Sequence, residues 1–471
     1  MISNNTKSTY KIANDYDMIA TIKISMPKNI SKLKYDVVII GGLGHVGLPL
    51  GIVLAERGLN VCLYDIDKNN GEKVRNGQMP FIEYGAQEIL EKVLKDQRLA
   101  VSYDIEDISK AKYVIVTIGT PVDEHLTPRT RAFLEFFEGI KKYLNPNQVI
   151  IVRSTVYPNT CKQLLRMLQN GKQWHIAYCP ERITQGYAIK ELRELPQIVS
   201  GLSEYAITSA STLFSMIAPK IIRTSIGEAE LVKLFSNAWR YIQFALANQF
   251  YMISHKFDVD YERVRWAMKE GYVRAANLPS AGFAAGPCLL KDTMQLAAFD
   301  SNNFLMGHIA MMVNEGLPNF IVEDLKRRYD LTNTKVGILG MAFKADIDDV
   351  RDSLSYKLGK ILRFNGADVY YSDEYAKNPD FISKNELIET CKIIIVGVPH
   401  SNYKALVIPE RIEVVDLWGI VRGGRREISK GYITAEYKNI DSSPQDYNEE
   451  FFGNINFAQQ VVRIKKSAKS K

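Results

Sequence analysis

The chain of 471 residues is long enough for two or three domains, and its apolar fraction of 46% and charged fraction of 24% are ordinary for a water-soluble globular protein. The net charge of +7 lies in the tails, since residues 1–34 carry +4 and residues 461–471 carry +5, which leaves −2 for the body and excludes a nucleic-acid-binding face on the folded part. The five cysteines are widely spaced and lack metal-ligand spacing, which argues against a disulfide framework and a metal site and favours the cytoplasm. The sequence has no apolar run of about 18 residues, which argues against a membrane span.

The folded part begins with the elements of a nucleotide-binding unit. The apolar run over residues 35–40 predicts a buried parallel strand, and an amphipathic helix over 48–57 and a second strand over 60–64 follow it. The turn between strand and helix reads Gly42-Leu43-Gly44-His45-Val46-Gly47. Its first glycine permits the tight turn, the second lets a pyrophosphate approach the backbone, and the third lets helix and strand pack.

A carboxylate stands at the end of the second strand. Asp65 follows Gly42 by 23 residues, where an acid binds the ribose hydroxyls of a dinucleotide and repels the 2′-phosphate of NADP. The N-terminus of the helix offers free N–H groups to the phosphates. The unit therefore predicts NAD as the cofactor, and a merely structural glycine turn is the alternative.

Two later strands end in hydroxyl residues. The strand expected over 113–118 leads to Thr120, and the strand expected over 148–152 leads to Ser154 and Thr155. In open parallel sheets, ligands bind at the carboxyl ends of the strands, so these side chains are candidates for cofactor contacts. Capping of the chain ends by hydroxyl groups is an equally good interpretation of their position.

A long helical pattern runs from Glu228 to about Lys256 and contains no Gly or Pro. Such a helix, roughly 40 Å long, can bridge two domains and serve as the seam of a homodimer. Lys233 and Asn237 are four residues apart and share one face of it. The alternative is that Lys233 and Asn237 lie on a solvent-exposed face of the helix, which is the usual position of a helical lysine.

A loop of small residues over 279–292 leads to one thiol. Its glycines and alanines allow a ligand to approach the backbone, and Cys288, Lys291 and Asp292 then place a nucleophile beside a cation and a carboxylate. This is the pattern of covalent catalysis, although a lone cysteine is more often a small buried hydrophobe. A further helical stretch is expected over about 292–328.

A second alternation of strands and helices follows. Strands are expected over 335–339, 368–371, 392–396 and 413–417, with a helix near 355–364. This second unit lacks the glycine-rich fingerprint, so its ligand is not expected to be another dinucleotide. The sequence predicts an α/β protein with two Rossmann-like open parallel-sheet domains, joined by a helical middle domain with a long central helix. The expected boundaries are an extension over 1–34, an NAD domain over 35–226, a helical dimerisation domain over 227–330, a second α/β domain over 331–440 and a basic tail over 441–471.

With these motifs assembled in order, the chain resembles the UDP-glucose/GDP-mannose dehydrogenase family over roughly residues 35–430. The resemblance implies oxidation of the C6 alcohol of a nucleotide sugar to a carboxylate with two NAD. The catalytic residues that match the family are Cys288, Lys233, Asn237, Asp292 and Glu181. With the glycine-rich turn, the expected cofactor contacts are Gly42, Gly44, His45, Val46, Gly47, Asp65, Thr120, Ser154, Thr155 and Arg351. The expected substrate contacts are Glu181, Arg182, Lys233, Asn237, Arg274, Gly282, Phe283, Lys291, Phe343 and Lys344.

The resemblance also implies a specific role for each of the main site residues. Asp292, through a water held by Lys233 and Asn237, is expected to take the hydroxyl proton in the first oxidation. Cys288 is expected to attack the aldehyde to give a thiohemiacetal, which is oxidised to a thioester, and Glu181 is expected to activate the water that cleaves it. Lys344 is expected to bind the phosphates of the sugar nucleotide. Arg274 is expected to reach the sugar site of a neighbouring subunit.

The sugar is left open between UDP-N-acetylglucosamine, UDP-N-acetylmannosamine and UDP-glucose. The runs Pro180-Glu181-Arg182 and Asn314-Glu315-Gly316-Leu317-Pro318 favour the branch of the family that acts on N-acetylated sugars. Two other classes are considered. A two-electron β-hydroxyacid-type dehydrogenase would need neither the thiol nor the second α/β domain, and a non-catalytic nucleotide-sugar-binding protein would not need the intact set of reactive residues.

Overall fold

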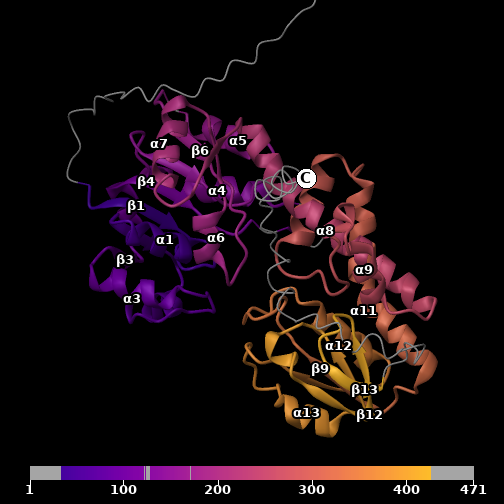
Figure 1. The fold of residues 1–471 in the computed structure, drawn as a ribbon. Helices are drawn as coiled ribbons and strands as arrows, with labels where there is room; N and C mark the ends of the chain where they lie inside the picture. Colours follow the sequence, from indigo (N-terminus) through magenta and orange to yellow (C-terminus); the bar gives the residue numbers. More distant parts are fainter. Residues whose placement is uncertain (1–32, 121, 124–127, 170, 426–471) are drawn as a thin grey trace, which may run out of the picture.

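The computed structural model describes residues 33–425 except 121, 124–127 and 170. The basic C-terminal tail lies outside the described residues, as does the N-terminal extension apart from its last two residues. Figure 1 shows an N-terminal α/β lobe, drawn in indigo to magenta, and a C-terminal α/β lobe, drawn in orange to yellow, with a group of helices beside and between them. None of the described helices is long and apolar enough to cross a membrane.

The N-terminal lobe is built on an eight-stranded sheet of described residues. Its strands in chain order are β1 Tyr35–Ile40, β2 Val61–Tyr64, β3 Leu99–Ser102, β4 Ala111–Val116, β5 Val149–Val152, β6 His175–Tyr178, β7 Gln197–Gly201 and β8 Ile221–Arg223. They lie in the order β3-β2-β1-β4-β5-β6-β7-β8. Its helices are α1 Gly47–Glu56, α2 Lys68–Arg75, α3 Gln87–Lys95, α4 Thr130–Ile140, α5 Thr160–Leu168, α6 Ala188–Glu194 and α7 Glu204–Phe214, with the short 3₁₀ turns η1 Ile105–Lys110 and η2 Lys141–Tyr143.

One strand pairing in this sheet departs from the parallel arrangement that the sequence predicts. All neighbouring strands are parallel except β6 and β7, which pair antiparallel through Ala177 with Gly201 and Tyr178 with Ser200. A parallel return needs a crossover of a dozen or more residues that runs back along the sheet. The connection here, residues 179–196, does not run back along the sheet, and its one helix is the seven-residue α6, so the chain enters β7 from the end of the sheet where β6 stops.

Strand β1 shows why its sequence is apolar throughout. Val37 and Ile39 belong to a hydrophobic cluster with α1, α3, α6 and α7, whereas Val38 and Ile40 belong to a second cluster with α4 and α5. Successive side chains of a strand point to opposite faces, and here both faces are covered by helices. The sheet is therefore the central layer of a three-layer lobe, and its loops at the carboxyl ends of the strands are left free to carry a site.

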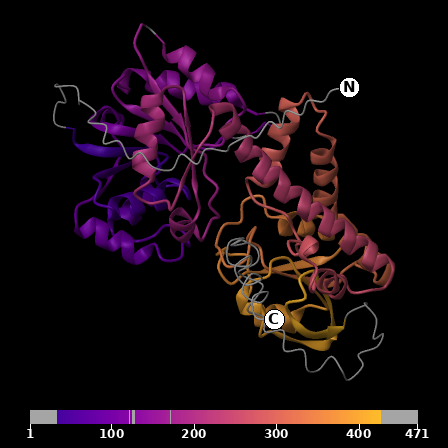
Figure 2. The same ribbon diagram turned by 45° about the horizontal axis from the view of Figure 1, so that its top comes forward.

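The helical middle contains α8 Ile226–Lys256, α9 Tyr261–Lys269, η3 Val273–Ala275, α10 Leu289–Phe299 and α11 Leu305–Arg328. The long α8, which leaves the N-terminal lobe in Figure 2, starts at a capping box formed by Ser225 and Glu228. The prediction of one helical stretch over about 292–328 was wrong, because α10 and α11 are separate helices. Ser301 and Asn302, with φ of 51° and 62°, adopt left-handed conformations that end the first of them.

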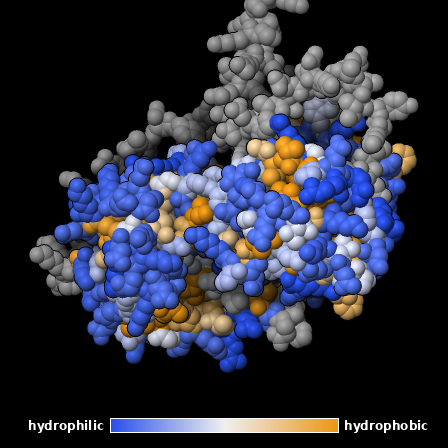
Figure 3. Space-filling model, turned by 90° about the horizontal axis from the view of Figure 1, so that it is seen from below, coloured by the Kyte–Doolittle hydropathy of each residue, from blue (hydrophilic) through white to orange (hydrophobic). Residues whose placement is uncertain are grey.

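The C-terminal lobe contains a smaller, entirely parallel sheet of described residues. Its strands are β9 Lys335–Leu339, β10 Asp368–Ser372, β11 Ile393–Val396, β12 Val407–Asp416 and β13 Arg422–Arg425, and its helices are α12 Leu354–Phe364 and α13 Lys384–Thr390, with the 3₁₀ turn η4 Ser401–Tyr403. The strand order is β10-β9-β11-β12-β13. Helices α11 and α12 cover one face, and α13 covers the other. The prediction of two parallel-sheet α/β domains joined by a helical middle is confirmed. On the face that Figure 3 shows, hydrophilic residues predominate and hydrophobic residues gather in small patches.

Candidate active site

The glycine-rich turn after β1 has the shape that a dinucleotide requires. A Cβ atom on Gly42 would lie 2.8 Å from Cα of Leu63, and one on Gly47 would lie 2.4 Å from the carbonyl oxygen of Gly41. A Cβ atom on Gly44 would meet nothing nearer than 3.6 Å. The first and third glycines are thus needed for close packing, and space is left at the second, where the pyrophosphate of NAD would approach the backbone.

Asp65 lies beside this turn, as its position in the sequence predicts. Its Oδ2 accepts a hydrogen bond of 3.0 Å from the backbone N–H of Leu43, and its Oδ1 accepts bonds from the N–H groups of Ile66 and Asp67. These bonds fix the carboxylate at the end of β2, next to the phosphate-binding turn. An adenosine ribose bound there would meet a negatively charged acceptor.

The hydroxyl residues at the ends of β4 and β5 make backbone hydrogen bonds and also adjoin the reactive group. Oγ1 of Thr120 donates to the carbonyl oxygen of Thr155 at 2.5 Å, and Oγ of Ser154 donates to that of Ile118 at 2.7 Å. Thr120 is also 3.4 Å from Nζ of Lys291. These hydroxyls bond to backbone carbonyl groups at the strand ends, their cofactor contacts stay a prediction, and Thr120 in addition joins the NAD lobe to Lys291 near the thiol.

Cys288 is the N-cap residue of α10 and its side chain is exposed, unlike those of the other four cysteines. Crowding by protein atoms raises the pKa of the thiol, and the carboxylate of Asp292 raises it further. The charges of Lys233, Lys291 and Arg351 act in the opposite direction. The structure therefore brings a protonated, accessible thiol together with three cations and one carboxylate.

Asp292 is the most tightly held member of this group. Its side chain is fully buried, Oδ2 accepts a 2.6 Å bond from Nδ2 of Asn237, and Oδ1 lies 2.8 Å from Nζ of Lys291. Asn237 comes from α8, one turn after Lys233, and Asp292 comes from α10, one turn after Cys288. The two helices thus bring together four of the five predicted catalytic residues.

The loop before Cys288 is anchored by residues that sequence reasoning missed. The buried Asn248 of α8 accepts from the N–H of Gly282 at 2.8 Å and donates to its carbonyl oxygen at 3.0 Å. A Cβ atom on Gly282, whose φ is +151°, would lie 1.9 Å from the ring of Trp418, so only glycine fits. Asn248 lies eleven residues after Asn237 and therefore on the same face of α8, which is the signal that would have revealed it. No sequence signal indicates Trp418.

The loop between β9 and α12 carries the remaining predicted residues of the C-terminal lobe. Phe343 packs against Gly286, where a Cβ atom would lie 2.6 Å from the ring. Nζ of Lys344 donates to the carbonyl oxygen of Gln185 at 3.2 Å and lies 4.7 Å from the ring of Tyr187. Burial lowers the pKa of Lys344 to about 7. Lys344 thus reaches across to the N-terminal lobe.

Asp349, which was not predicted, joins the two lobes at the cofactor turn. Its carboxylate receives two-pronged hydrogen bonds from Arg351 and a 3.0 Å bond from Nε2 of Gln185, and its Oδ2 lies 3.6 Å from Nε2 of His45. Burial lowers the pKa of His45 to about 4, so the ring is neutral at pH 7. The first loop of the NAD lobe and the first loop of the C-terminal lobe therefore meet directly.

Glu181 is placed differently from the rest of the predicted catalytic set. Its carboxylate forms an ion pair with the fully buried Arg153 and accepts hydrogen bonds of 2.7 and 2.9 Å from the N–H groups of Arg182 and Ile183. The guanidinium of Arg182 donates to the carbonyl oxygen of Pro196. Within the described residues, no hydrogen bond or ion pair connects Glu181 to the group around Cys288.

Two other predicted substrate residues have contrasting positions. Phe283 is buried in the hydrophobic cluster shared with α8 and the C-terminal lobe. Arg274 is exposed on η3, and its Nη1 lies 3.3 Å from Oη of Tyr272. Among the described residues, Arg274 makes no hydrogen bond or ion pair with another predicted site residue. Its expected contact with the sugar site of a neighbouring subunit stays a prediction.

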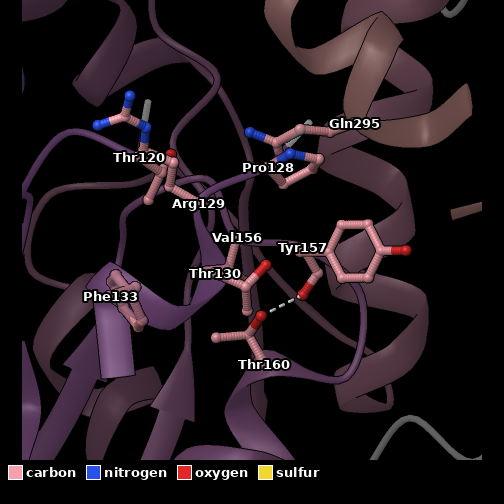
Figure 4. Close-up of a pocket in the computed structure, with 9 residues that line it drawn as sticks. All are labelled: Thr120, Pro128, Arg129, Thr130, Phe133, Val156, Tyr157, Thr160 and Gln295. Atoms are coloured by element: carbon pink, nitrogen blue, oxygen red, sulfur yellow. Dashed lines mark hydrogen bonds between the residues drawn. The ribbon is translucent and has the colours of Figure 1, made fainter. Parts of the chain in front are cut away.

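A small pocket with an empty volume of about 240 Å³ lies between the NAD lobe and α10. Figure 4 shows the residues that line it. The lining residues are Thr120, Pro128, Arg129, Thr130, Phe133, Val156, Tyr157, Thr160 and Gln295. Thr120, which contacts Lys291, is the predicted site residue among them. The pocket therefore lies where the strand ends of the NAD lobe meet α10.

A turn shaped for a dinucleotide, next to a thiol with a lysine and a buried carboxylate, defines a dinucleotide-dependent dehydrogenase. Comparison with known proteins specifies it further. The chain belongs to the UDP-glucose/GDP-mannose dehydrogenase family: residues 36–217 match its NAD binding domain, 227–315 its central domain and 337–422 its UDP binding domain. It is an NAD-dependent oxidoreductase, and the predictions of the family and of the cofactor are confirmed.

Several relatives share most of the chain. A UDP-N-acetyl-D-mannosamine dehydrogenase from Pyrococcus horikoshii is 30% identical over 381 residues, which is 78% of this chain and 90% of that protein. One of the same name from Campylobacter jejuni is 28% identical over 68% of this chain and 82% of that protein. A solved UDP-D-ManNAc dehydrogenase from P. horikoshii has a TM-score of 0.74 at 25% identity over 82% of this chain and 98% of that one. A solved UDP-glucose dehydrogenase from Pyrobaculum islandicum, at 23% identity and a TM-score of 0.77 over 85% and 98% of the two chains, shares the fold.

Proposed function

We propose that the protein oxidises the C6 alcohol of a UDP-N-acetylhexosamine to the uronate, in two steps that each reduce one NAD. The observation that carries the proposal is the accessible Cys288 beside Lys291 and the buried Asp292. The relatives named UDP-N-acetyl-D-mannosamine dehydrogenase support an N-acetylated sugar and make UDP-N-acetylmannosamine the first substrate to test. NAD, when bound at the glycine-rich turn, accepts the hydride in each step.

In the first oxidation, Asp292 removes the proton of the C6 hydroxyl through a water held by Lys233 and Asn237. Support comes from the bonds of Asp292 to Asn237 and Lys291, which hold the carboxylate in one orientation. A preorganised base and a nearby cation stabilise the charge that develops on oxygen without rearranging during the reaction. The product of this step is an aldehyde that stays in the site.

In the second oxidation, Cys288 adds to the aldehyde carbon. Because the pKa of the thiol is raised in the ligand-free protein, its proton has to move to a base as the C–S bond forms, and the carboxylate of Asp292 lies one helical turn away. Protonation of the former carbonyl oxygen gives a thiohemiacetal. Loss of its C–H as hydride, together with transfer of its hydroxyl proton to a base, gives a thioester. Water cleaves the thioester to the carboxylate and regenerates the thiol.

Glu181 contributes to the last step by orienting the water. Arg153 and two backbone N–H groups hold its carboxylate in one orientation, so it acts as a hydrogen-bond acceptor that directs the water. Arg153 holds Glu181 in place from a fully buried position. This assignment separates the group that captures the aldehyde from the group that serves hydrolysis.

The test is the stoichiometry of NADH with UDP-N-acetylmannosamine, UDP-N-acetylglucosamine and UDP-glucose. We expect two NADH per sugar with no free aldehyde, and a loss of turnover to the acid on the order of 10⁴-fold for Cys288→Ala. The matched control is Cys391→Ala, a buried thiol in the C-terminal lobe, which should cost about 1–2 kcal/mol of stability and leave turnover intact. One NADH per sugar, or near-normal acid production by Cys288→Ala, would refute the mechanism.

We further propose that the working enzyme is a homodimer assembled along α8. Exposed apolar side chains recur on this helix at spacings of four and seven residues, which places them on one face: Phe235, Trp239, Leu246, Ile253 and Phe257. Further exposed apolar residues on α11 are Leu305, Met306, Ile309 and Met312. A second copy of the same face would cover this surface, and such a large exposed apolar area is typical of an interface.

Light scattering tests the dimer. Wild type should have twice the mass of one chain, and Trp239→Glu should shift it to a monomer. Phe364→Glu is the control, because Phe364 is 91% exposed on α12, away from the apolar face of α8. If the wild-type protein is a fully active monomer, both the dimer and the expected contact of Arg274 with the sugar site of a partner subunit are contradicted.

A further inference from the structure

A buried histidine lies under the loop that carries Phe343 and Lys344. His400 follows β11, and its side chain is 0% exposed. The rings of Tyr375 and Tyr403 pack against it with centroids at 4.9 and 5.3 Å. None of the predicted roles used this residue, yet both of its ring nitrogens are engaged.

The hydrogen bonds define how the ring acts. The backbone N–H of Asp346 donates to Nδ1 at 2.9 Å, so Nδ1 is an acceptor. Nε2 lies 3.1 Å from Oδ2 of Asp373 and therefore carries the ring proton, which it donates to that carboxylate. One imidazole thus connects a backbone amide of one loop to an acid at the end of β10.

These two partners hold the two ends of a single segment. Oδ2 of Asp373 also accepts from the N–H groups of Met341 and Ala342, at 2.6 and 3.0 Å. At the other end, the carboxylate of Asp346 accepts from the N–H and Oγ of Ser401, at 2.7 and 2.5 Å. Asp346 has a φ of +60°, a conformation that a non-glycine residue keeps only when its surroundings enforce it. His400 therefore closes a clamp on residues 341–346.

Phe343 and Lys344 lie between the two clamped ends. Phe343 packs against Gly286, two residues before Cys288, and Lys344 reaches Gln185 in the other lobe. Oη of Tyr84 adds a bond of 2.7 Å to the carbonyl oxygen of Asp346, so the clamped end also contacts the NAD lobe. A shift of the segment would move the Lys344 ammonium relative to the loop of the thiol.

We propose that His400 is a positioning residue for the nucleotide sugar: it fixes the backbone of residues 341–346 so that Phe343 and Lys344 meet the substrate. The inference rests on the proposed function and on the expectation from the sequence that Lys344 binds the phosphates of the sugar nucleotide. An apolar residue would fill the same space in the core, but it would supply neither the acceptor for the Asp346 amide nor the donor to Asp373. His400 acts through these bonds and does not itself touch the reacting atoms.

A graded series of variants separates this role from simple packing. His400→Asn keeps an acceptor near the position of Nδ1 and loses the donor to Asp373, whereas His400→Phe keeps the volume and loses both. The dissociation constant of UDP-N-acetylmannosamine, measured by calorimetry well below the melting temperature, should rise about fivefold for the asparagine variant and further for phenylalanine, since each lost hydrogen bond of this kind costs about 1 kcal/mol, which is about fivefold in affinity. The dissociation constant of NAD should stay within about twofold.

The control and the coupling test use two other residues. His255→Asn removes a partly buried histidine, paired with Asp324 at 2.9 Å, and should lower the melting temperature without changing sugar-nucleotide affinity. Because His400 acts through Lys344, the factors by which His400→Asn and Lys344→Met each weaken sugar-nucleotide binding should not multiply in the double variant.

The outcomes distinguish the two proposals. Independent, multiplying losses, or an equal weakening of NAD and sugar-nucleotide binding, would overturn the positioning role while wild-type binding stands. If the wild-type protein binds none of the three UDP-sugars, the proposed function fails and the inference fails with it.

Discussion

The lowered pKa of the partly buried Lys344 predicts that binding of a sugar nucleotide takes up a proton. Its pKa in the ligand-free protein is about 7, against an ordinary value of 10.5, because burial disfavours the ammonium. A bound diphosphate favours the ammonium and raises this pKa. The diphosphate diester of a UDP-sugar keeps its charge between pH 6 and 9, so the diphosphate itself adds no pH dependence over this range.

The size of the effect follows from the pKa. At pH 9, only about 1% of Lys344 in the ligand-free protein would be protonated, so binding must supply the proton at a cost of up to tenfold in affinity per pH unit above 7. Affinity should therefore fall with rising pH, by nearly a hundredfold between pH 6 and pH 9 if the pKa in the complex exceeds 9. The sign is fixed, because the charged form is the one that binds the anion.

Calorimetry at pH 8 in two buffers of different ionisation enthalpy measures the proton uptake directly. Lys344→Met should bind more weakly at pH 6 and lose the pH dependence, while Lys360→Met, an exposed lysine of α12, should retain it. Burial also raises the pKa of Glu83 to about 7, so Glu83→Gln is needed to separate its contribution. A dissociation constant that does not change with pH in wild type, or the same slope in Lys344→Met, would refute the assignment.

Three further predictions address other parts of the molecule. NAD should be preferred over NADP, and Asp65→Ala should narrow the ratio of their kcat/KM values; equal use of both by wild type would contradict the assigned ribose contact. Gly282→Ala should destabilise the protein by about 2–4 kcal/mol in urea unfolding because of the Trp418 ring, whereas Gly139→Ala in α4, where a Cβ atom meets nothing within 4 Å, should be neutral or stabilising. Alkylation of Cys288 by iodoacetamide should still accelerate as the pH rises through 9, because the pKa of the thiol lies above its usual value. Lys233→Met removes a cation that lowers this pKa and should slow the reaction at a given pH. A rate that levels off below pH 8 would argue against a raised thiol pKa.

The features that depend on neighbours in sequence could be predicted. The turn after β1 needs its glycines because of contacts within about 25 residues, and Cys288, Lys291 and Asp292 lie within five residues of one another, so both appear in the sequence as patterns. Both α/β lobes could be predicted for the same reason, because the alternation of strands and helices is also a pattern of residues close in sequence. The bounds of α8 differ by only two residues from those expected.

The features that depend on distant contacts could not be predicted. Asn237 reaches Asp292 because α8 packs against α10, and periodicity does not specify which helix faces which. Gly282 needs to be a glycine because of Trp418, which is 136 residues further along the chain. The antiparallel β7 depends on where the chain turns after β6, and the ion pair of Arg153 with Glu181 joins the ends of two strands.

The reactive thiol belongs to neither α/β lobe, and this has a consequence for splitting the polypeptide. The loop that carries Cys288 is tied to α8 by Asn248, seated on the C-terminal lobe by Trp418 and joined to the NAD lobe through Lys291 and Thr120. A fragment that ends before β9 would keep the dinucleotide turn but lose the surface on which the loop rests. Separately expressed halves, cut between α11 and β9, should therefore recover oxidation of the sugar only when mixed, which would make reconstitution from fragments a direct report on the docking of the three parts.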